Sequence, residues 1–463
     1  MKLSTSAQPP AAPDVLVVGG GTAALCAAIS ARRAGASVVL LEQAPRMQRG
    51  GNTRHSRNLR VVHEMSTAFS AGTYSAAEFE ADLLRATGGR GDPALTQQLV
   101  QASAAIPEWL LAAGVRLQPT TSGVLPVSRK TVFLLGGGMF MLNALYDTAA
   151  RLGVIIRYDA GVTALRFSDR HLEQAWVGQE VLRPRTAILC SGGAQADQAW
   201  LERSWGAAAR GFINRGTPFA KATLLASMPR QGIMLTGDPG AAYLVAVDAR
   251  YPNADGGIVT RIRCMPLGIV VDATGQRRHD ESGDTASTRY ALWGQRLATW
   301  PRQTGYLILD AAGMRDAPPS LYPPLLADSL DALAMRLQIP YAALAATLER
   351  YNTAIISAGD APETWRTERL QPPKSRDARP ITEPPFAAYP MRPGITWTYH
   401  GVAVDARLRV QRQDGGHIDN LFAAGMIMAP NLLPSGYLSG LAMTIGIVFG
   451  CLAGTGAADY ARR

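Results

Sequence analysis

The sequence has few cysteines and no cluster of metal-binding side chains. Its four cysteines are scattered without a CxxC pair, and its six histidines are dispersed along the chain as well. This spacing argues against a disulfide framework and against a structural metal site. A cysteine content this low is typical of a protein from a reducing compartment.

Lysine is also scarce, because only four of the 46 basic residues are lysines. The formal net charge of +10 and the abundance of arginine suit an anionic partner, such as a carboxylate substrate or anionic lipid. A biased genome composition explains the same numbers equally well. No basic cluster contains interleaved aromatic residues, so we expect no nucleic-acid partner. The polar start of the chain, residues 1 to 13, lacks the apolar core of a signal peptide, which predicts a cytoplasmic protein.

One long segment contains no charge at all, since no charged residue occurs from Met426 to Ala458. Such a run is long enough to span a bilayer. Prolines, glycines and polar residues interrupt its first half, however, and the apolar part from Leu438 to Leu452 is short for a span. We therefore predict a helix buried within the fold. Its N-terminus, between Ser439 and Ala442, would direct a partial positive charge toward a bound cofactor.

The most informative motif is a glycine turn near the N-terminus. Asp14-Val-Leu-Val-Val-Gly-Gly-Gly-Thr-Ala-Ala-Leu25 predicts a strand, a glycine turn and a helix, and Val38-Val-Leu-Leu-Glu42 predicts a second strand that ends in an acid. Gly19 permits the tight turn, and Gly21 lets the backbone approach a pyrophosphate. A glycine triplet alone is weak evidence, but this complete βαβ unit favours dinucleotide binding over an ordinary βαβ turn.

Two further parts of the motif contact the nucleotide in this hypothesis. The backbone amides near Thr22 and Ala23, at the start of the helix, would face the phosphates. Glu42 would accept hydrogen bonds from both ribose hydroxyls. An acid at this position disfavours a 2′-phosphate, so NADP is not the expected nucleotide.

The order of strand and helix patterns along the chain predicts an α/β fold with a discontinuous Rossmann-like nucleotide domain. A buried strand and glycine turn at Arg185–Gly193 would return the chain to the nucleotide sheet. Helical patterns cover Pro93–Ala113 and Leu330–Asn352, and short strands mixed with prolines indicate an inserted α+β domain. The predicted segments are residues 1–234 and 386–463 for the nucleotide domain and 235–385 for the insertion.

Several motifs together resemble one family, the FAD-dependent fumarate reductase/succinate dehydrogenase flavoprotein superfamily, which also holds the 3-ketosteroid dehydrogenases. These motifs are the glycine turn, Glu42-Gln-Ala-Pro, Gly50-Gly-Asn-Thr, Cys190-Ser-Gly-Gly and Leu421-Phe-Ala-Ala-Gly425. Longer segments resemble the tricarballylate dehydrogenase flavoproteins more closely. They include Gly51-Asn-Thr-Arg-His-Ser-Arg-Asn-Leu-Arg60, Arg215-Gly-Thr-Pro-Phe219, Thr288-Arg-Tyr-Ala-Leu-Trp-Gly294 and Gly436-Tyr-Leu-Ser-Gly440.

The resemblance implies that FAD, rather than NAD, lies in the glycine turn, and that the insertion is a capping domain. It assigns further FAD contacts to residues from four parts of the chain: Gly51, Asn52, Thr53, Val162, Ser191, Gly192, Gly425, Met426, Ser439 and Leu441. Some relatives bind FAD covalently through a histidine in the glycine loop. Asn52 stands at that position here, so we expect noncovalent FAD, although His55 lies nearby.

The chemistry implied by the resemblance is hydride transfer between a substrate C–C bond and flavin N5, with proton exchange at the adjacent carbon. Arg289 corresponds best to the arginine that carries the proton, and a solvated helix position is the alternative for it. Glu281 and Asp280 would form the acid side of a proton relay, or else they pair with Arg277 and Arg278. His400 corresponds to a histidine that binds a substrate carboxylate.

Tyr437 stands where fumarate reductases carry a second carboxylate-binding arginine. A tyrosine donates a hydrogen bond to a carboxylate or a ketone but supplies no charge, and it also packs well against a flavin. Arg54, Arg57 and Arg60 in the glycine loop would replace the missing charge, because a guanidinium binds carboxylate in a bidentate manner. A solvated surface loop is the alternative for these three arginines.

Two departures from the family pattern leave the substrate open. Met426 replaces a family glutamate on the ribityl side of FAD, and the Cys-His pair of tricarballylate enzymes is missing after Asp238-Pro-Gly. Three functions remain: oxidation or reduction of a C–C bond beside a carboxylate, with tricarballylate as the narrow version; the same chemistry on a cyclic ketone; and a non-catalytic flavin-binding subunit. Because the sequence offers no haem or iron–sulfur ligands, we expect a separate electron acceptor, with the protein cytoplasmic or peripheral to a membrane.

Overall fold

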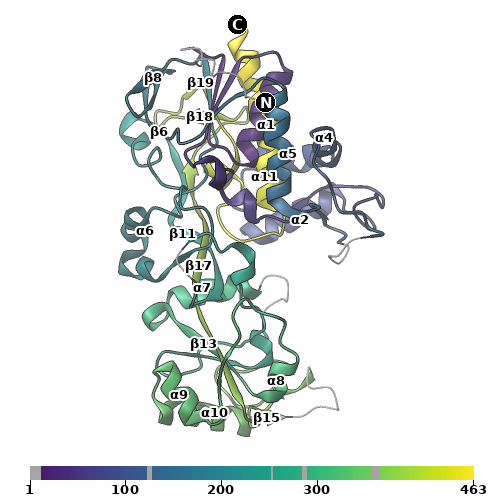
Figure 1. Ribbon diagram of the computed structural model, residues 1–463, viewed down its shortest axis with the longest axis vertical. Coiled ribbons are helices and arrows are strands. Elements are labelled where there is room, and N and C mark those ends of the chain that lie inside the picture. Colours follow the sequence, from purple (N-terminus) through teal and green to yellow (C-terminus); the bar gives the residue numbers. More distant parts are fainter. Residues whose placement is uncertain (1–11, 123–127, 252–253, 284–288, 357–363) are drawn as a thin grey trace, which may run out of the picture. The chain divides into compact units, whose positions relative to one another are not determined.

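The computed structural model describes residues 12–122, 128–251, 254–283, 289–356 and 364–463, and it divides the chain into two compact units (Figure 1). Unit 1 comprises Met1–Trp200, Thr217–Ala242 and Trp397–Arg463. Unit 2 comprises Leu201–Gly216 and Tyr243–Thr396. The first unit is therefore assembled from three separate stretches of chain, as the predicted discontinuous domain requires.

A six-stranded sheet with the order β18-β19-β9-β1-β2-β5 forms the centre of unit 1. Its strands are β1 (Val15–Val18), β2 (Val38–Leu41), β5 (Ile155–Arg157), β9 (Thr186–Leu189), β18 (Arg409–Gln411) and β19 (His417–Ala423). All neighbouring pairs are parallel except β18 with β19. The chain moves outward from β1 to β2 and β5 and then returns to β9 on the other side. This order creates the switch point at which α/β sheets bind ligands.

Helices α1 (Thr22–Arg33) and α11 (Leu441–Ala461) pack against this sheet, and α5 (Gly137–Arg151) packs against α1. Glycines let α11 approach α1 closely. An added Cβ atom would lie 2.6 Å from the Ala23 carbonyl oxygen at Gly450 and 2.3 Å from that of Ala27 at Gly454. Among the described residues, α11 is long and apolar enough to cross a membrane, but 72% of its apolar window is buried inside the structure. The predicted charge-free helix is therefore present and largely buried.

The rest of unit 1 consists of small sheets and peripheral helices. Its remaining strands are β3 (Asn58–Arg60) and β4 (Thr131–Phe133), and a meander of β6 (Val162–Ser168), β7 (His171–Val177) and β8 (Glu180–Leu182). Its helices are α2 (Ala76–Thr87), α3 (Pro93–Ser103) and α4 (Ile106–Ala112), and α6 (Gln198–Trp205) extends across the boundary at Trp200. The prediction of one helix at Pro93–Ala113 is wrong, because Pro107 is favourable only in the first turn of a new helix.

Unit 2 is built around a second sheet with the order β10-β17-β13-β12, and β11 and β14 also pair with β17. The strands are β10 (Ile213–Asn214), β11 (Leu235–Asp248), β12 (Ile269–Asp272), β13 (Gly305–Leu309), β14 (Leu325–Ala327) and β17 (Phe386–Val402), with a separate pair, β15 (Ile355–Ile356) and β16 (Arg366–Thr367). Its helices are α7 (Arg289–Ala298), α8 (Ala311–Arg315), α9 (Leu330–Leu337) and α10 (Tyr341–Thr353). The predicted single helix at Leu330–Asn352 is two helices, because Pro340 separates them.

The predicted domain boundaries differ from those of the structure. The chain passes between the units after Ala242 and after Thr396, rather than at residues 235 and 385, and the short stretch Leu201–Gly216 also belongs to unit 2. The first two boundaries fall inside the long strands β11 and β17. A change of composition did not mark them, because each strand continues through its boundary and the nearby turn residues, such as Gly240 and Gly394, lie inside the strand.

Candidate functional site

The glycine turn joins β1 to α1 at the carboxyl edge of the unit 1 sheet. Gly19 has a φ of 120°, and an added Cβ atom would lie 2.4 Å from the Cys190 carbonyl oxygen, so only glycine fits. At Gly21 an added Cβ atom would stay 3.5 Å from the nearest protein atoms. The protein itself therefore leaves room at Gly21, which is what a closely approaching ligand requires.

Glu42 lies at the end of β2, beside the glycine turn, and is buried. Its Oε1 atom accepts a hydrogen bond from the Ala44 amide (3.0 Å), and its Oε2 atom accepts one from the Gly50 amide (2.9 Å). Burial raises the pKa of Glu42, and these amide donors oppose the rise. The contacts hold the carboxyl group at the strand end where a ribose would be recognised.

The loop that follows β2 lies on the start of α1. Thr53, in the 3₁₀ turn Gly51–His55, accepts a hydrogen bond from the Thr22 amide through Oγ1 (3.1 Å), and the two hydroxyl groups lie 2.8 Å apart. The Oδ1 atom of Asn52 accepts a hydrogen bond from the Thr217 amide (2.9 Å). Gly51 has a φ of 57°, and no protein atom lies within 4 Å of an added Cβ atom. The loop thus presents open backbone beside the first turn of α1.

The other predicted FAD contacts also follow strand ends or begin strands of unit 1. Ser191 and Gly192 follow β9, and Gly192, with a φ of 78°, has no protein atom within 4 Å of an added Cβ atom. Gly425 and Met426 follow β19, and an added Cβ atom at Gly425 would lie 2.7 Å from that of Ala23. Val162 begins β6 and is buried. Ser191 and Gly192 thus follow a parallel neighbour of β1, and Gly425 and Met426 follow β19, which is the parallel neighbour of β9. Val162 belongs instead to the small sheet β6-β7-β8.

The turn before α11 is held by β3. Asn58 donates a hydrogen bond from Nδ2 to Oγ of Ser439 (2.9 Å), and Arg60 donates from Nε to the Ser439 carbonyl oxygen (3.2 Å). The Arg60 amide also donates to Oγ1 of Thr444 (2.9 Å). Leu441 begins α11, and its N-cap residue, Gly440, provides no capping side chain. The first amides of α11 are therefore fixed in place without a side-chain cap.

These observations fit a dinucleotide cofactor. The parallel strands end at one edge of the sheet, two helices begin there without capping by their own N-cap side chains, and an acid lies at the end of β2. The residues that would hold FAD are the amides at the start of α1 for the pyrophosphate and Glu42 for the ribose. The loop at Gly51–His55 and the turn at Ser439 would lie along the remainder of the cofactor.

The contacts of Arg60 differ from the prediction that it binds the substrate. Its Nη1 atom lies 2.9 Å from Oδ2 of Asp82 and 2.6 Å from the Tyr74 hydroxyl, and both charged side chains are buried. Lys130 donates to the same carboxylate (2.7 Å). Burial alone would raise the pKa of Asp82, but these donors outweigh it, so that pKa is lowered. Arg60 therefore has a carboxylate partner within the chain, on α2.

His400 lies near the end of β17, within unit 1 and partly buried. Its Nδ1 atom lies 3.1 Å from the Gly237 carbonyl oxygen, which only accepts, so Nδ1 carries the proton. The Trp200 ring lies beside the imidazole, with 5.9 Å between centroids. Burial lowers the pKa of His400 below its usual value, although the Gly237 carbonyl opposes this change. Nε2 is then the nitrogen available for a ligand.

Tyr437 belongs to an aromatic cluster in the turn that precedes α11. Its ring lies 6.3 Å from that of Trp397, and the Trp397 ring lies 6.3 Å from that of Tyr399 at a right angle. The Tyr399 hydroxyl donates a hydrogen bond to the Gly436 carbonyl oxygen. Because an added Cβ atom at Gly436 would lie 1.8 Å from the Ala86 carbonyl oxygen, the turn fits closely against α2. Tyr437 is thus held on a turn with little freedom to move.

The two remaining catalytic candidates belong to unit 2. Glu281 is fully buried, pairs with Nη2 of Arg277 (2.7 Å) and accepts a hydrogen bond from the Val270 amide (2.8 Å). The structure thus contains the pairing with Arg277 that was the alternative to a proton relay. Arg278 pairs instead with Asp272, not with Asp280. Arg289 begins α7, but its side chain lies outside the described part of the structure.

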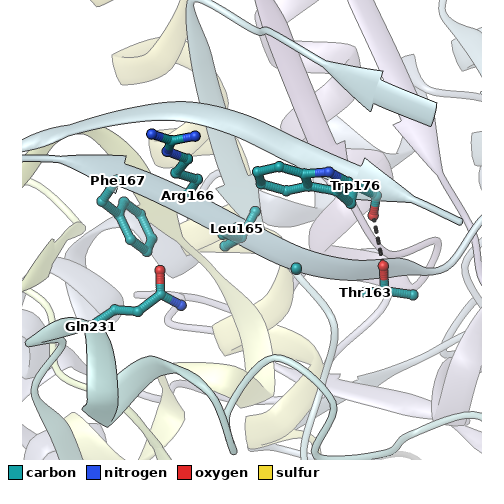
Figure 2. Close-up of a pocket in the computed structure, with 7 residues that line it drawn as sticks. Thr163, Leu165, Arg166, Phe167, Trp176 and Gln231 are labelled. Atoms are coloured by element: carbon teal, nitrogen blue, oxygen red, sulfur yellow. Dashed lines mark hydrogen bonds between the residues drawn. The ribbon is translucent and has the colours of Figure 1, made fainter. Parts of the chain in front are cut away.

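A groove of about 350 Å³ lies along the β6–β7 hairpin (Figure 2). Its lining residues are Thr163, Ala164, Leu165, Arg166, Phe167, Trp176 and Gln231. In Figure 2 the Gln231 side chain points toward the Phe167 ring, and Oγ1 of Thr163 donates to the Trp176 carbonyl oxygen (3.4 Å). None of the site residues predicted from the sequence lines this groove.

With this geometry established, comparison with known proteins identifies the class. The chain belongs to the FAD binding domain family, whose model matches residues 14–432, and to the fumarate reductase/succinate dehydrogenase flavoproteins within it. This membership confirms FAD as the cofactor, and it confirms the predicted α/β fold and the class of flavin-dependent oxidoreductase. A specific closeness to the tricarballylate enzymes is not among the findings.

Two curated relatives match nearly the whole chain. The NADH:fumarate oxidoreductase of Klebsiella pneumoniae (strain 342) is 26% identical over 97% of this chain and 48% of its own length. The chain thus spans about half the length of that relative. The fumarate reductase (cytochrome) of Shewanella frigidimarina is 26% identical over 97% of this chain and 78% of its own length. The open conformation of a flavocytochrome c3 fumarate reductase has the same fold, with a TM-score of 0.78, 23% identity, and coverage of 98% of this chain and 80% of that one.

Sequence reasoning missed two features of the cofactor site. An added Cβ atom at Gly20 would lie 2.3 Å from both Oε2 of Glu42 and the Tyr146 hydroxyl, which donates to the Gly20 carbonyl oxygen (2.8 Å). The middle glycine of the triplet is therefore the one that packs against the acid. Three glycines of α11, Gly446, Gly450 and Gly454, recur at every fourth position, and this spacing was the available signal for close packing against α1.

Proposed function

We propose that the protein is an FAD-dependent oxidoreductase that forms or reduces a C–C double bond beside a carboxylate group. The observation that carries this proposal is His400. One imidazole nitrogen is committed to the Gly237 carbonyl oxygen, and the other is left to a ligand, on a chain related to two proteins named for fumarate chemistry. Bound FAD would supply a hydride donor or acceptor.

The contribution of His400 follows from its protonation state. Burial lowers its pKa, so the imidazole is neutral near pH 7 and Nε2 is an acceptor. A substrate carboxylate at Nε2 can only accept a hydrogen bond, so Nε2 must carry a proton to bind it. The negative charge of the carboxylate would also raise the pKa of the imidazole. We infer that substrate binding takes up a proton at Nε2 and thereby forms a charge-assisted hydrogen bond. The binding site would thus become cationic only when it holds its anion.

The narrow form of the proposal names tricarballylate as the substrate and a cis-aconitate-type product. Electrons would then leave through a separate protein, and the relative from Shewanella frigidimarina is named with a cytochrome. Arg54 and Arg57 are the arginines of the glycine loop that remain candidates for a second carboxylate, since Arg60 pairs with Asp82.

The experiment is anaerobic mixing of the purified yellow holoenzyme with tricarballylate, succinate or a steroid enone, followed by the flavin absorbance. Chemically reduced holoenzyme is mixed with fumarate or cis-aconitate in parallel. Bleaching or reoxidation with a carboxylate supports the proposal. Bleaching with tricarballylate alone supports its narrow form, and no response to any carboxylate in either direction rejects the proposal.

A cyclic ketone is the second candidate substrate, and Tyr437 favours it. The phenol is held on a closely packed turn, and a neutral hydroxyl donor polarises a ketone oxygen without requiring an anion. Substitution by phenylalanine separates the two functions. Tyr437→Phe should abolish turnover of an enone, because it removes the donor that polarises the ketone oxygen. Carboxylate turnover should fall far less, because the carboxylate is held by His400 in that case.

A further inference from the structure

Two segments of unit 1 contain no acidic residue. Residues 43 to 63 include five arginines, and residues 109 to 146 include two further arginines and a lysine, without any Asp or Glu. A mixed surface would interleave both signs of charge over stretches of this length. The two segments are therefore a strongly basic part of a chain whose net charge is already +10.

The two segments pack against each other. Strands β3 and β4 form an antiparallel pair, and the Leu134 amide donates to the Arg57 carbonyl oxygen (2.8 Å). The Gly138 amide donates to the Ser56 carbonyl oxygen (2.7 Å). Nη2 of Arg49 donates to Oδ1 of Asn143 on α5 (2.7 Å). The loop after β2 thus lies along the start of α5 (Figure 1).

Large apolar side chains protrude from the same region. Met47 is 84% exposed and Phe140 is 68% exposed, and Leu135 and Met139 are exposed as well. The Phe140 ring covers Gly136, where an added Cβ atom would lie 2.6 Å from it, and the Leu135 amide donates to the Arg116 carbonyl oxygen (3.0 Å). We call this surface the α5 patch. It comprises Met47, Leu135, Met139 and Phe140, together with the exposed arginines Arg46 and Arg116.

Nearby acids do not neutralise the α5 patch. Glu78 and Asp82 of α2 are bound by Arg129 and Lys130, on the strand end that leads away from Leu135. Glu42 is buried, and Asp147 is exposed two turns further along α5. The arginines beside the apolar side chains therefore retain an excess of positive charge.

We propose that the α5 patch is a docking surface for an anionic phospholipid bilayer. The apolar side chains enter the boundary between head groups and acyl chains, and the arginines contact lipid phosphates. An acidic protein would also attract the arginines of this patch. It would not, however, provide the acyl layer that the exposed side chains of Met47 and Phe140 can enter. The surface would bring the flavoprotein to a membrane, whichever substrate it uses.

The test is co-sedimentation of the purified holoenzyme with vesicles of phosphatidylcholine alone or of phosphatidylcholine mixed with phosphatidylglycerol. We expect binding only to the anionic vesicles and weaker binding at high salt. Phe140→Ser should weaken binding about tenfold, because the apolar side chain contributes more than 1 kcal/mol when buried. Arg46→Gln and Arg116→Gln should each weaken it about fivefold, which corresponds to about 1 kcal/mol per arginine.

Matched controls lie on α9, in unit 2. Met335 is 77% exposed, and Arg336 beside it is exposed, so Met335→Ser and Arg336→Gln remove similar side chains from another surface. Both controls should bind anionic vesicles as the unchanged protein does. Equal binding to both kinds of vesicle, no binding to anionic vesicles, or equal losses in the α9 controls would overturn the proposal. Retained FAD and an unchanged melting temperature establish that each variant is folded.

Discussion

The guanidinium of Arg60 lies 2.9 Å from the carboxylate of Asp82, and both side chains are buried. The pair links β3 to α2, and Arg60 also donates to the Ser439 carbonyl oxygen in the turn before α11. An arginine that the sequence suggested for substrate binding is thus engaged in holding three elements together. Its position still matters for the cofactor, because the turn it holds precedes the first amides of α11.

We predict that breaking this pair is strongly destabilising. Arg60→Gln should lower the free energy of unfolding by about 1.5 to 3 kcal/mol, because the buried carboxylate loses one of its charged hydrogen-bond donors while Lys130 and Arg85 remain. Chemical denaturation measures the change. Asp459→Asn is the control, since it removes the surface partner of Arg462 and should cost less than about 1 kcal/mol. Similar losses in the two variants would contradict the assignment of a buried structural pair.

The Asp82 carboxylate also makes the free energy of unfolding depend on pH in the acidic range. The pKa of Asp82 is lowered in the folded protein, so its contribution is complete above the pKa of the unfolded chain. That contribution is lost as the pH falls through the folded-state pKa. In Asp82→Asn the unfolding free energy should therefore fall less between pH 5 and pH 3 than in the unchanged protein, and an equally steep fall would count against this carboxylate.

For His400, we predict that substrate affinity depends on pH. The free imidazole has a lowered pKa, and the proposed complex requires its protonated form. Above the free pKa, KM for a carboxylate substrate should rise by up to about tenfold per pH unit until the raised pKa of the complex is passed. A KM that does not change from pH 6 to pH 8 would exclude proton uptake at this residue.

A matched substitution isolates the second nitrogen of the ring. His400→Asn retains a donor for the Gly237 carbonyl oxygen but has no atom equivalent to Nε2. It should raise KM about 10- to 100-fold, since a hydrogen bond to a charged group contributes about 1.5 to 3 kcal/mol. His417→Asn removes an imidazole that pairs with Asp419 and should leave KM unchanged. Steady-state kinetics on both variants makes the comparison.

The sequence was most informative where the signal was local. Strand β1, the glycine turn and Glu42 were predictable because glycine spacing and a period-free apolar run specify a βαβ unit within about 30 residues. The contacts of Arg60 were not predictable in this way, since Arg60 lies on β3 and Asp82 is 22 residues away on α2. Gly20 and Tyr146 are 126 residues apart and meet only after α5 has packed.

The two incorrectly predicted helices each contain a proline that marks the true break. Pro107 and Pro340 each interrupt a stretch with continuous helical periodicity, and the periodicity was followed instead of the proline. The domain boundaries after Ala242 and Thr396 could not be located from prolines, because β11 and β17 continue through them although Pro239 and Pro393 lie close by. Such a strand belongs to both units, so its residue types do not indicate where one unit ends and the next begins.

We also predict that FAD is bound without a covalent link. Asn52 occupies the position at which some relatives have a histidine, and its Oδ1 atom accepts a hydrogen bond from the Thr217 amide. Acid precipitation of the holoenzyme should leave all the flavin in the supernatant. Flavin that remains with the pellet would contradict the prediction, and its disappearance in His55→Ala would then identify the attachment residue.

The last prediction concerns the contact between the first and last helices, α1 and α11. At Gly450 an added Cβ atom would lie 2.6 Å from the Ala23 carbonyl oxygen, whereas at Gly456 the nearest atom, from the Phe422 ring, would be 3.4 Å away. Gly450→Ala should therefore destabilise the protein by about 1 to 3 kcal/mol, the usual cost of overpacking. Gly456→Ala should stabilise it by about 0.5 to 1 kcal/mol, because alanine is the better helix former.

The two variants should also differ in cofactor binding. Gly450→Ala should displace the first turn of α1, where the amides near Ala23 would face the pyrophosphate of bound FAD, so the FAD dissociation constant should rise. Gly456→Ala leaves that turn in place, and its dissociation constant should not change. Thermal unfolding and fluorescence titration of the apoprotein with FAD measure both quantities. If the two alanines behaved alike, the close approach of α11 to α1 would not be what positions the phosphate-binding amides.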